Sequence, residues 1–95
     1  MMTSIDHGAG LRLRLFIVAG SPGSRIALSN LERVMAEAGI DRASVEIVDV
    51  SEAPDKAVAA GVLVTPTLDV TRGDRHFQIS GRLNDVPGVI GRLAG

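Results

Sequence analysis

One stretch of the sequence restricts the fold most. It is a strand pattern that changes from alternating to continuously apolar, followed at once by a helix pattern. Residues 11–15 alternate between leucine and arginine, and residues 16–18 are all apolar. Alternation that gives way to a continuous apolar run is typical of a strand that enters the centre of a sheet. We therefore predict a strand over Leu11–Ala19, leading directly into a helix.

The helix that follows has signals at both ends. Ser21 can cap it, and Pro22 would then occupy the first helical position, where its missing N–H is harmless. Gly39 indicates the C-terminal end. Between these ends, apolar residues recur at steps of three and four and form one stripe: Ala27, Leu28, Leu31, Val34, Met35 and Ala38.

The middle of the chain predicts a second strand followed by a second helix. The strand is expected to be buried and to cover Val45–Val50. A short helix is predicted within Ser51–Gly61, with Ser51 or Glu52 near its cap and Pro54 in its first turn. This segment therefore repeats the strand-then-helix order of the preceding one.

The end of the chain predicts one more helix. Apolar residues within Val86–Leu93 have helical spacing, and Asn84 or Asp85 precedes them as a possible cap. Glycine inside a helix costs about 1 kcal/mol relative to alanine. Gly88 and Gly91 should therefore weaken this helix.

A hairpin between the second and third helices completes the predicted fold. Thr67–Thr71 and His76–Ser80 alternate between apolar and polar residues, and a glycine-containing turn joins them. The order is β-α-β-α-β-β-α, in which strands joined through a helix are parallel and the hairpin adds an antiparallel pair. We predict a thioredoxin-like α/β fold: one domain over residues 11–95 with a mixed four-stranded sheet flanked by helices, after a flexible leader at residues 1–10.

The composition excludes several classes of function. The chain has no cysteine, and therefore no disulfide, cysteine nucleophile or thiolate metal site. Its net charge is −1 and it lacks Trp and Tyr, so it has neither the charge nor the stacking residues of a nucleic-acid-binding protein. His7 and His76 have no second ligand at metal-binding spacing. Without a membrane-spanning run or a visible signal peptide, we expect a cytoplasmic protein that binds no membrane.

Part of the chain resembles thioredoxins. Val48–Pro54 and Gly61–Leu68 are similar to that family's strand, short helix and cis-proline loop, which implies that the Thr65–Pro66 bond is cis. Thioredoxins carry a Cys-x-x-Cys motif at the start of the first helix, where this chain has Ser21-Pro22-Gly23-Ser24. A serine hydroxyl cannot form a disulfide, so thiol–disulfide chemistry is excluded.

A wider resemblance, from Leu11 to about Leu83, is to the circadian clock protein KaiB family. It rests on an ordered set of segments: Leu15-Phe16-Ile17-Val18-Ala19-Gly20, Ser24, Ala27-Leu28, Val48-Asp49-Val50 and Thr65-Pro66-Thr67-Leu68. Gly81 and Leu83 fall where the family carries Gly-Asp-Leu, with Arg82 in place of the aspartate, and the first turn is one residue shorter.

The KaiB resemblance implies a non-enzymatic regulatory protein that docks on the ring ATPase KaiC and needs no cofactor. It also implies an equilibrium between a thioredoxin-like state and a second, usually tetrameric, fold. The regular alternation of the 67–80 hairpin favours the thioredoxin-like state. We expect a monomer or weak oligomer that binds through the first helix and the edge of the sheet.

Candidate partner-binding residues are the basic side chains Arg12, Arg14, Arg25, Arg33 and Lys56, with Arg42 as a further member of the group. Taken singly, each is more typical of a solvated surface charge. Thr65, Pro66, Gly81 and Arg82 are interpreted as structural positions, and no catalytic residue is predicted.

Two other functions stay open at this point. The KaiB resemblance extends to the amino-terminal sensor domain of clock-linked histidine kinases, so the partner could be such a kinase. A glutathione-binding protein that uses Ser21 at the helix start, with Thr65-Pro66 binding the tripeptide backbone, is the enzyme alternative. Helix capping is the favoured role for Ser21, because serine is a preferred cap and we expect no helical second domain that would complete a transferase site.

Overall fold

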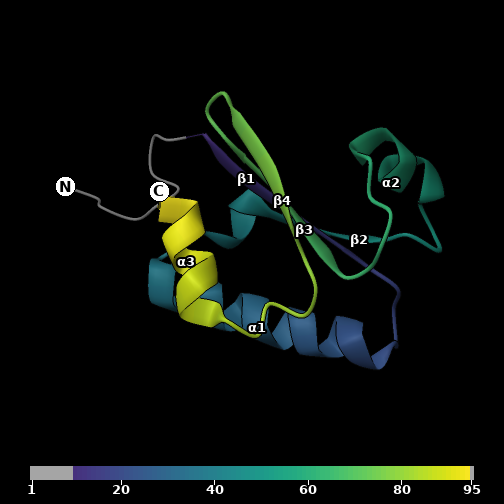
Figure 1. Cartoon of the computed structure of the whole chain (residues 1–95), viewed down its shortest axis with the longest axis horizontal. Coiled ribbons are helices and arrows are strands. Elements are labelled where there is room, and N and C mark those ends of the chain that lie inside the picture. The colour runs from purple at the N-terminus through teal and green to yellow at the C-terminus, as the bar shows by residue number, and fades with distance from the viewer. Residues whose placement is uncertain (1–9, 95) are drawn as a thin grey trace.

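The computed structural model describes residues 10–94, and the order of their elements is the predicted one (Figure 1). Most of the predicted leader, residues 1–9, lies outside the described residues. A short 3-10 helix, η1, precedes the second strand and was not predicted. The elements are β1 (Leu11–Ile17), α1 (Pro22–Ala38), η1 (Arg42–Ser44), β2 (Val45–Asp49), α2 (Pro54–Ala60), β3 (Thr67–Arg72), β4 (Arg75–Ser80) and α3 (Val86–Ala94).

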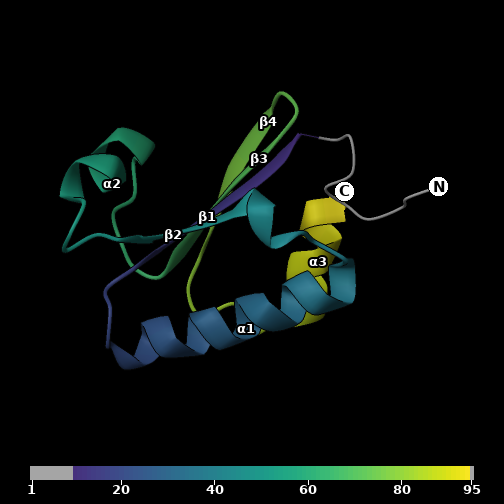
Figure 2. The same ribbon diagram turned by 180° about the vertical axis from the view of Figure 1, so that it is seen from behind.

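The four strands form one mixed sheet in the order β2-β1-β3-β4. β1 is parallel to β2, as the intervening helix requires, and antiparallel to β3, while β3 and β4 form the predicted hairpin. α1 and α3 cover one face of the sheet and α2 lies on the other (Figures 1 and 2). The thioredoxin-like fold class predicted from the pattern is therefore confirmed.

The main core lies between the sheet and the α1–α3 layer. The leucines of β1 alternate inward, and the apolar stripe of α1 packs against them. A much smaller cluster under α2 contains only three buried side chains, Phe16, Val48 and Ala57. Most of the apolar burial that stabilises the fold is thus on one face of the sheet.

The ends of α1 are those that the sequence predicts. The hydroxyl of Ser21 accepts a hydrogen bond from the amide of Ser24 at 3.2 Å, and Pro22 is the first helical residue. Gly39 ends the helix in the left-handed conformation, with φ 69°, and its amide bonds to the carbonyl of Met35. Both end signals are confirmed.

Two local predictions need correction. β1 ends at Ile17 rather than Ala19, because the amide of Val18 donates to the hydroxyl of Ser24 and leaves the ladder. β2 is an edge strand rather than a buried one: Val48 is buried but Ile47 is 43% exposed. An apolar run in the sequence does not distinguish an edge strand from a central one.

Ser51 and Glu52 lie next to the cap of α2, as predicted, and Pro54 is in its first turn. The cap position itself is Ala53, which has no side-chain hydrogen bond. Ser51 is used elsewhere, since its hydroxyl donates to Asp49 at 2.7 Å and its amide donates to the same carboxylate oxygen at 3.0 Å. This local turn competes with capping for the serine side chain.

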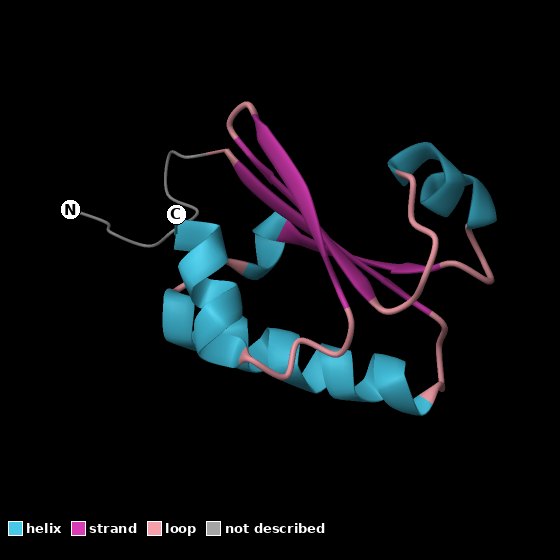
Figure 3. Ribbon diagram, viewed as in Figure 1, coloured by secondary structure: helices cyan, strands magenta, loops and turns pink. Residues whose placement is uncertain are grey.

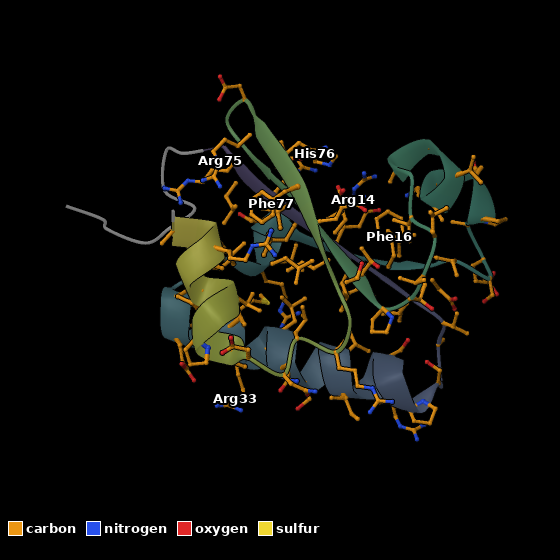
Figure 4. The ribbon with its side chains drawn as sticks, in the orientation of Figure 1. Arg14, Phe16, Arg33, Arg75, His76 and Phe77 are labelled. Atoms are coloured by element: carbon orange, nitrogen blue, oxygen red, sulfur yellow. The ribbon has the colours of Figure 1, made fainter. Side chains whose placement is uncertain are left out.

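α3 is attached to the hairpin by arginine side chains. The guanidinium groups of Arg75 and Arg92 lie 5.3 and 4.9 Å from the ring centroid of Phe77, and Arg72 donates to the carbonyl of Leu93. Asp85, one of the two predicted caps, accepts from the amide of Gly88 at 3.1 Å. Figure 4 shows Arg75 and Phe77 on the α3 side of the sheet.

Candidate functional site

The Thr65–Pro66 peptide bond, the start of α1 and the turn after β4 meet at one end of the molecule. The Thr65–Pro66 bond is cis, as the thioredoxin resemblance implied. The carbonyl of Pro66 accepts from the amide of Gly81 at 2.8 Å, and Gly81 has φ 104°, a conformation that other residues rarely adopt. A β-carbon on Gly23 would lie 3.6 Å from Pro66 Cδ and 3.5 Å from Arg82 Nε, so these three segments are in contact.

The two serines that stand in the place of the redox cysteines have structural hydrogen bonds. Ser24 is 1% exposed, and its hydroxyl accepts from the amide of Val18 at 3.0 Å. Ser21 caps α1 through the amide of Ser24. Both hydroxyl oxygens therefore satisfy backbone N–H groups at the point where the chain passes from strand to helix.

An apolar pocket of about 240 Å³ lies beside the cis-proline, lined by Val50, Ala57, Val62, Leu63, Val64 and Thr65. The apolar side chains at its rim are strongly exposed: Leu63 by 94% and Val64 by 57%, with Val58 on α2 exposed by 80%. Figure 3 shows that this stretch between α2 and β3 is a loop. Neighbouring exposed apolar residues of this kind mark an interaction surface more often than a solvent-facing one.

Sequence reasoning missed this pocket although a signal was present. Val62, Leu63 and Val64 form an apolar run between the glycine that ends α2 and the cis-proline, and they belong to no strand. An apolar run that lies outside every predicted helix and strand is a candidate for an interaction surface, because no predicted face of the core takes it up.

Two arginines lie at the same end of the molecule as the cis-proline. Arg25, in the first turns of α1, donates to the carbonyl of Gly20 at 2.9 Å, and Arg82 lies against the Gly23–Pro66 contact. Neither forms an ion pair with any carboxylate in residues 10–94. No carboxylate among the described residues therefore neutralises their charges, which are available to another protein.

The other predicted partner-binding residues fall into separate groups. Lys56 on α2 bonds to Glu46 on β2 at 2.9 Å, and this hydrogen bond lowers the pKa of Glu46, with smaller contributions from the charges of Arg14 and Arg12. These residues belong to the α2 face of the sheet. Arg33 lies on α1, 3.8 Å from Glu37, in the opposite layer.

Arg42 belongs with Arg33 rather than with the α2 group. It pairs with Glu32 of α1 at 2.8 Å. The hydrogen bond and the charge of Glu32 raise the pKa of Arg42. The fold thus does not bring the predicted basic residues together at one site.

A buried polar cluster on the α2 face was also missed. We call Asp69, Arg14, His76 and Gln78 the Asp69 cluster. Asp69 is 2% exposed and accepts from Arg14 at 3.2 Å, from His76 at 2.7 Å and from Gln78 at 2.9 Å. The sequence gives no signal for this cluster, because the donors to Asp69 are set by strand register, which a single sequence does not show.

The charge of Asp69 is stabilised by these donors. Burial alone would raise the pKa of its carboxyl. The hydrogen bonds from Gln78, His76 and Arg14 outweigh burial, and the pKa lies below its usual value. Figure 4 shows Arg14 and His76 on the same side of the sheet, with Phe16 beyond Arg14 towards α2. Arg14 is 5.2 Å from the Phe16 ring centroid.

Residues 14–72 match the KaiB domain, which spans the sheet from β1 to β3, both crossover helices and the cis-proline. The chain belongs to the KaiB family. It is 43% identical over 56 residues to the circadian clock protein KaiB3 of a Synechocystis species. That match covers 59% of this chain and 55% of the relative, so this KaiB-family chain matches little more than half the length of the relative.

Solved structures with the same fold include the N-terminal domain of SasA and several thioredoxins. The N-terminal domain of Synechococcus elongatus SasA superposes with a TM-score of 0.67 at 22% identity, covering 87% of this KaiB-family chain and 78% of that one. Thioredoxin from Fasciola hepatica gives 0.67 at 22% identity, with 93% and 86% covered. Thioredoxin NaTrxh from Nicotiana alata gives 0.71 at 16% identity, with 94% and 76% covered. At these identities the similarity establishes the fold alone.

Residues 10–94 contain neither a metal-binding cluster nor a membrane-spanning helix. No group of three or more histidine, aspartate or glutamate side chains in this range is placed to hold a metal ion. None of the helices described here has the length and apolar character needed to cross a membrane.

Proposed function

We propose that this chain is a non-enzymatic regulatory protein that binds a KaiC-like ring ATPase through the cis-proline end of the molecule. Membership of the KaiB family supports this function. The observation that carries it is the 94% exposure of Leu63 at the rim of an apolar pocket, in a chain whose other leucines are mostly buried. An exposed apolar side chain beside a pocket favours protein binding.

The proposed contact combines aliphatic and charged groups. The apolar area comes from Leu63, Val58 and Val64. The chain has no Trp or Tyr, so these aliphatic side chains would serve as the anchors of the contact. Arg25 and Arg82 supply positive charge without an ion-pair partner in the described residues. This combination favours a partner surface that carries apolar and acidic side chains together.

The other basic candidates play a lesser part in this proposal. Arg14, Arg33 and Lys56 already have carboxylate partners, so binding through them would exchange one ion pair for another. Arg12 forms no ion pair in the described residues, and it lies on the face of the sheet that carries α2. We retain these residues as secondary candidates.

The thioredoxin-like state is the proposed resting and binding state. β3 and β4 pair in unbroken register from Thr67–Ser80 to Arg72–Arg75. The Asp69 cluster adds hydrogen bonds across β1, β3 and β4. Such pairing favours strands in this part of the free protein, and helical chemical shifts across residues 67–80 would contradict the proposal.

Co-elution with the host's KaiC-like ATPase on a sizing column, with and without ATP, tests this function. We expect a shared high-mass peak that Leu63→Ser and Arg25→Glu each weaken. Arg75→Glu is the matched charge-reversal control, because Arg75 lies at the turn of the β3–β4 hairpin (Figure 4), and Pro66 precedes the opposite end of that hairpin. Separate elution of two folded proteins would overturn the proposal.

A histidine-kinase partner is the second candidate. The fold shared with the N-terminal domain of SasA supports it, together with the kinship that the KaiB resemblance implies. The same column experiment with a kinase encoded beside this gene separates the two candidates. In either case we propose that the protein acts in the cytoplasm as a monomer or weak oligomer.

Glutathione binding through Ser21 is the weakest of the three candidates. The Ser21 hydroxyl accepts a hydrogen bond from the amide of Ser24, so Ser21 serves as the cap of α1. We expect no heat when glutathione is titrated into the protein in a calorimeter. A saturable heat that Ser21→Ala abolishes would revive the enzyme alternative.

A further inference from the structure

Gln78 bridges the Asp69 cluster and α2, the helix that contributes to the wall of the apolar pocket. Its side-chain nitrogen donates to Asp69 at 2.9 Å and to the carbonyl of Ala60, the last residue of α2, at 2.8 Å. An amide nitrogen has two N–H groups, so both donors of Gln78 are used. The bridge links a buried strand residue to the end of a helix that lies 18 positions earlier than Gln78 in the sequence.

The Gln78 amide nitrogen is held by two acceptors. The Asp69 carboxylate and the Ala60 carbonyl only accept hydrogen bonds, so both select the orientation in which the amide nitrogen faces them. The bond to the ionised carboxylate is charge-assisted and the stronger of the two. Protonation of Asp69 removes that charge and weakens the anchor of the Gln78 side chain, while the Ala60 carbonyl remains an acceptor.

α2 has few other attachments to the sheet. Ala57 is its only buried residue, and the apolar cluster beneath it has two further buried members, Phe16 and Val48. The ion pair between Lys56 and Glu46 is the other polar tie from α2 to a strand among residues 10–94, and both side chains are substantially exposed. An exposed ion pair contributes only about 0–1 kcal/mol. At the C-terminal end of α2, Ala60 and Val62 also pack, partly buried, against the apolar cluster, and the bond from Gln78 to Ala60 adds a polar tie to the sheet there.

We propose that Asp69 is a positioning residue for the apolar pocket: through Gln78 it fixes the C-terminal end of α2 and the loop that carries Leu63 and Val64. Ala57 and Val62, on either side of that helix end, both line the pocket. The pocket's role in partner binding rests on the proposed function. The positioning itself is a property of the free protein and is tested without a partner.

The charged groups around Asp69 come from three elements. Arg14 on β1 and His76 on β4 bond to it directly. Arg12 and Glu46 are the next charged groups on this face of the sheet. The charges of Arg14 and Arg12 both lower the pKa of Glu46. Of the three donors to Asp69, only Gln78 continues to α2. Loss of the Gln78 link alone should therefore loosen α2 selectively.

Amide hydrogen exchange of the full chain, followed by NMR, tests this positioning. The amides of Gly61 and Val62 bond to Val58 and Ala57 at the end of α2, at 3.1 and 2.9 Å, and report on that end. In Gln78→Met we expect their protection factors to fall about threefold to tenfold relative to those of Leu13 and Leu15 in β1, the effect of losing one hydrogen bond. His76→Met is the matched control, because it removes a donor to Asp69 without touching α2.

The pH profile distinguishes positioning by the carboxylate from a merely structural role of Gln78. In the wild type the protection ratio between the α2 and β1 amides should stay level down to about pH 4, the usual aspartate pKa, and fall only at lower pH, because the pKa of Asp69 in the folded protein lies below that value. In Gln78→Met the ratio should be low and independent of pH. An unchanged ratio in Gln78→Met, a ratio that His76→Met lowers equally, or a flat wild-type profile would each overturn the inference.

Discussion

The carboxylate of Asp85 accepts a hydrogen bond from the amide of Gly88 at 3.1 Å, and a β-carbon on Gly88 would lie only 2.2 Å from that carboxylate. The cap of α3 and the glycine three residues later therefore depend on each other. From helix propensity alone, Gly88 is expected to destabilise α3. In the structure the absence of its side chain is what lets the cap form.

This dependence predicts a non-additive pair of substitutions. Asp85→Ala should cost about 1 kcal/mol through loss of the cap. Gly88→Ala should be close to neutral, because the gain of about 1 kcal/mol in helix propensity is offset by displacement of the capping carboxylate. In the Asp85→Ala background the same change should stabilise the protein by about 1 kcal/mol. Urea unfolding of the four proteins measures the coupling, and additive effects would contradict it.

The hydroxyl of Ser24 is predicted to be structural. Ser24→Ala removes the buried hydroxyl that accepts from the amide of Val18, an exposed residue, so we expect a loss of about 0.5–1.5 kcal/mol, the value of one hydrogen bond. Ser29→Ala, an exposed change on the same helix, serves as the control and should be neutral or slightly stabilising. Thermal unfolding gives both values. Equal stability of the two variants would show that the Ser24 bond contributes nothing.

Two glycine-to-alanine changes should have opposite signs. At Gly81 an added β-carbon meets no atom within 4 Å, but φ is 104°, so Gly81→Ala should cost about 1–3 kcal/mol in backbone strain. Gly91 also has open space around it and lies within α3, so Gly91→Ala should gain about 1 kcal/mol. Chemical denaturation of both variants tests this, and a neutral Gly81→Ala would be the contrary result.

Leu63→Ser is predicted to separate binding from stability. A side chain that is 94% exposed makes almost no contribution to the core, so the unfolding free energy should change by no more than about 0.5 kcal/mol. Capture of the partner should fall at the same time. Leu68→Ser, at a fully buried position in the same segment, should instead unfold the protein. A large loss of stability in Leu63→Ser would mean that Leu63 is not a free surface residue.

Acid should destabilise the protein through Asp69. Its pKa in the folded state lies below the usual value, so its charge stabilises the fold at every pH above about 4, the pKa of an unfolded aspartate. This contribution is lost as the pH falls further, through the lowered pKa of the folded state. Asp69→Asn should be less stable than wild type at pH 7, and the difference should shrink towards pH 2. A constant difference between these pH values would contradict the assignment.

The elements of this fold were predictable because their signals are local. The stripe of α1, its serine cap and its terminal glycine lie within one stretch of chain, and the structure confirms each of them. The same holds for the β3–β4 hairpin, whose alternation and turn are adjacent in the sequence. The cis state of Pro66 came from resemblance rather than from physics, since a single X–Pro bond does not reveal its isomer.

The candidate site was less predictable because it depends on distant pairings. Asp69 and Arg14 are 55 positions apart, and only the register of β1 against β3 makes them neighbours. Lys56 and Arg33 both looked like free surface charges, yet each has a carboxylate partner. Conversely, the exposure of Leu63 follows from the position of α2 and not from any property of leucine.

The sequence by itself determined the order and type of the elements, the absence of thiol chemistry and membership of a family, because periodicity, caps and residue identity act over a few positions or by identity alone. The tertiary structure decided which strand is an edge, which carboxylate is buried and which apolar side chains stay in water. These depend on how distant segments exclude solvent from one another. For Asp69 and Leu63 in particular, burial and exposure are properties of the packed sheet and helices together.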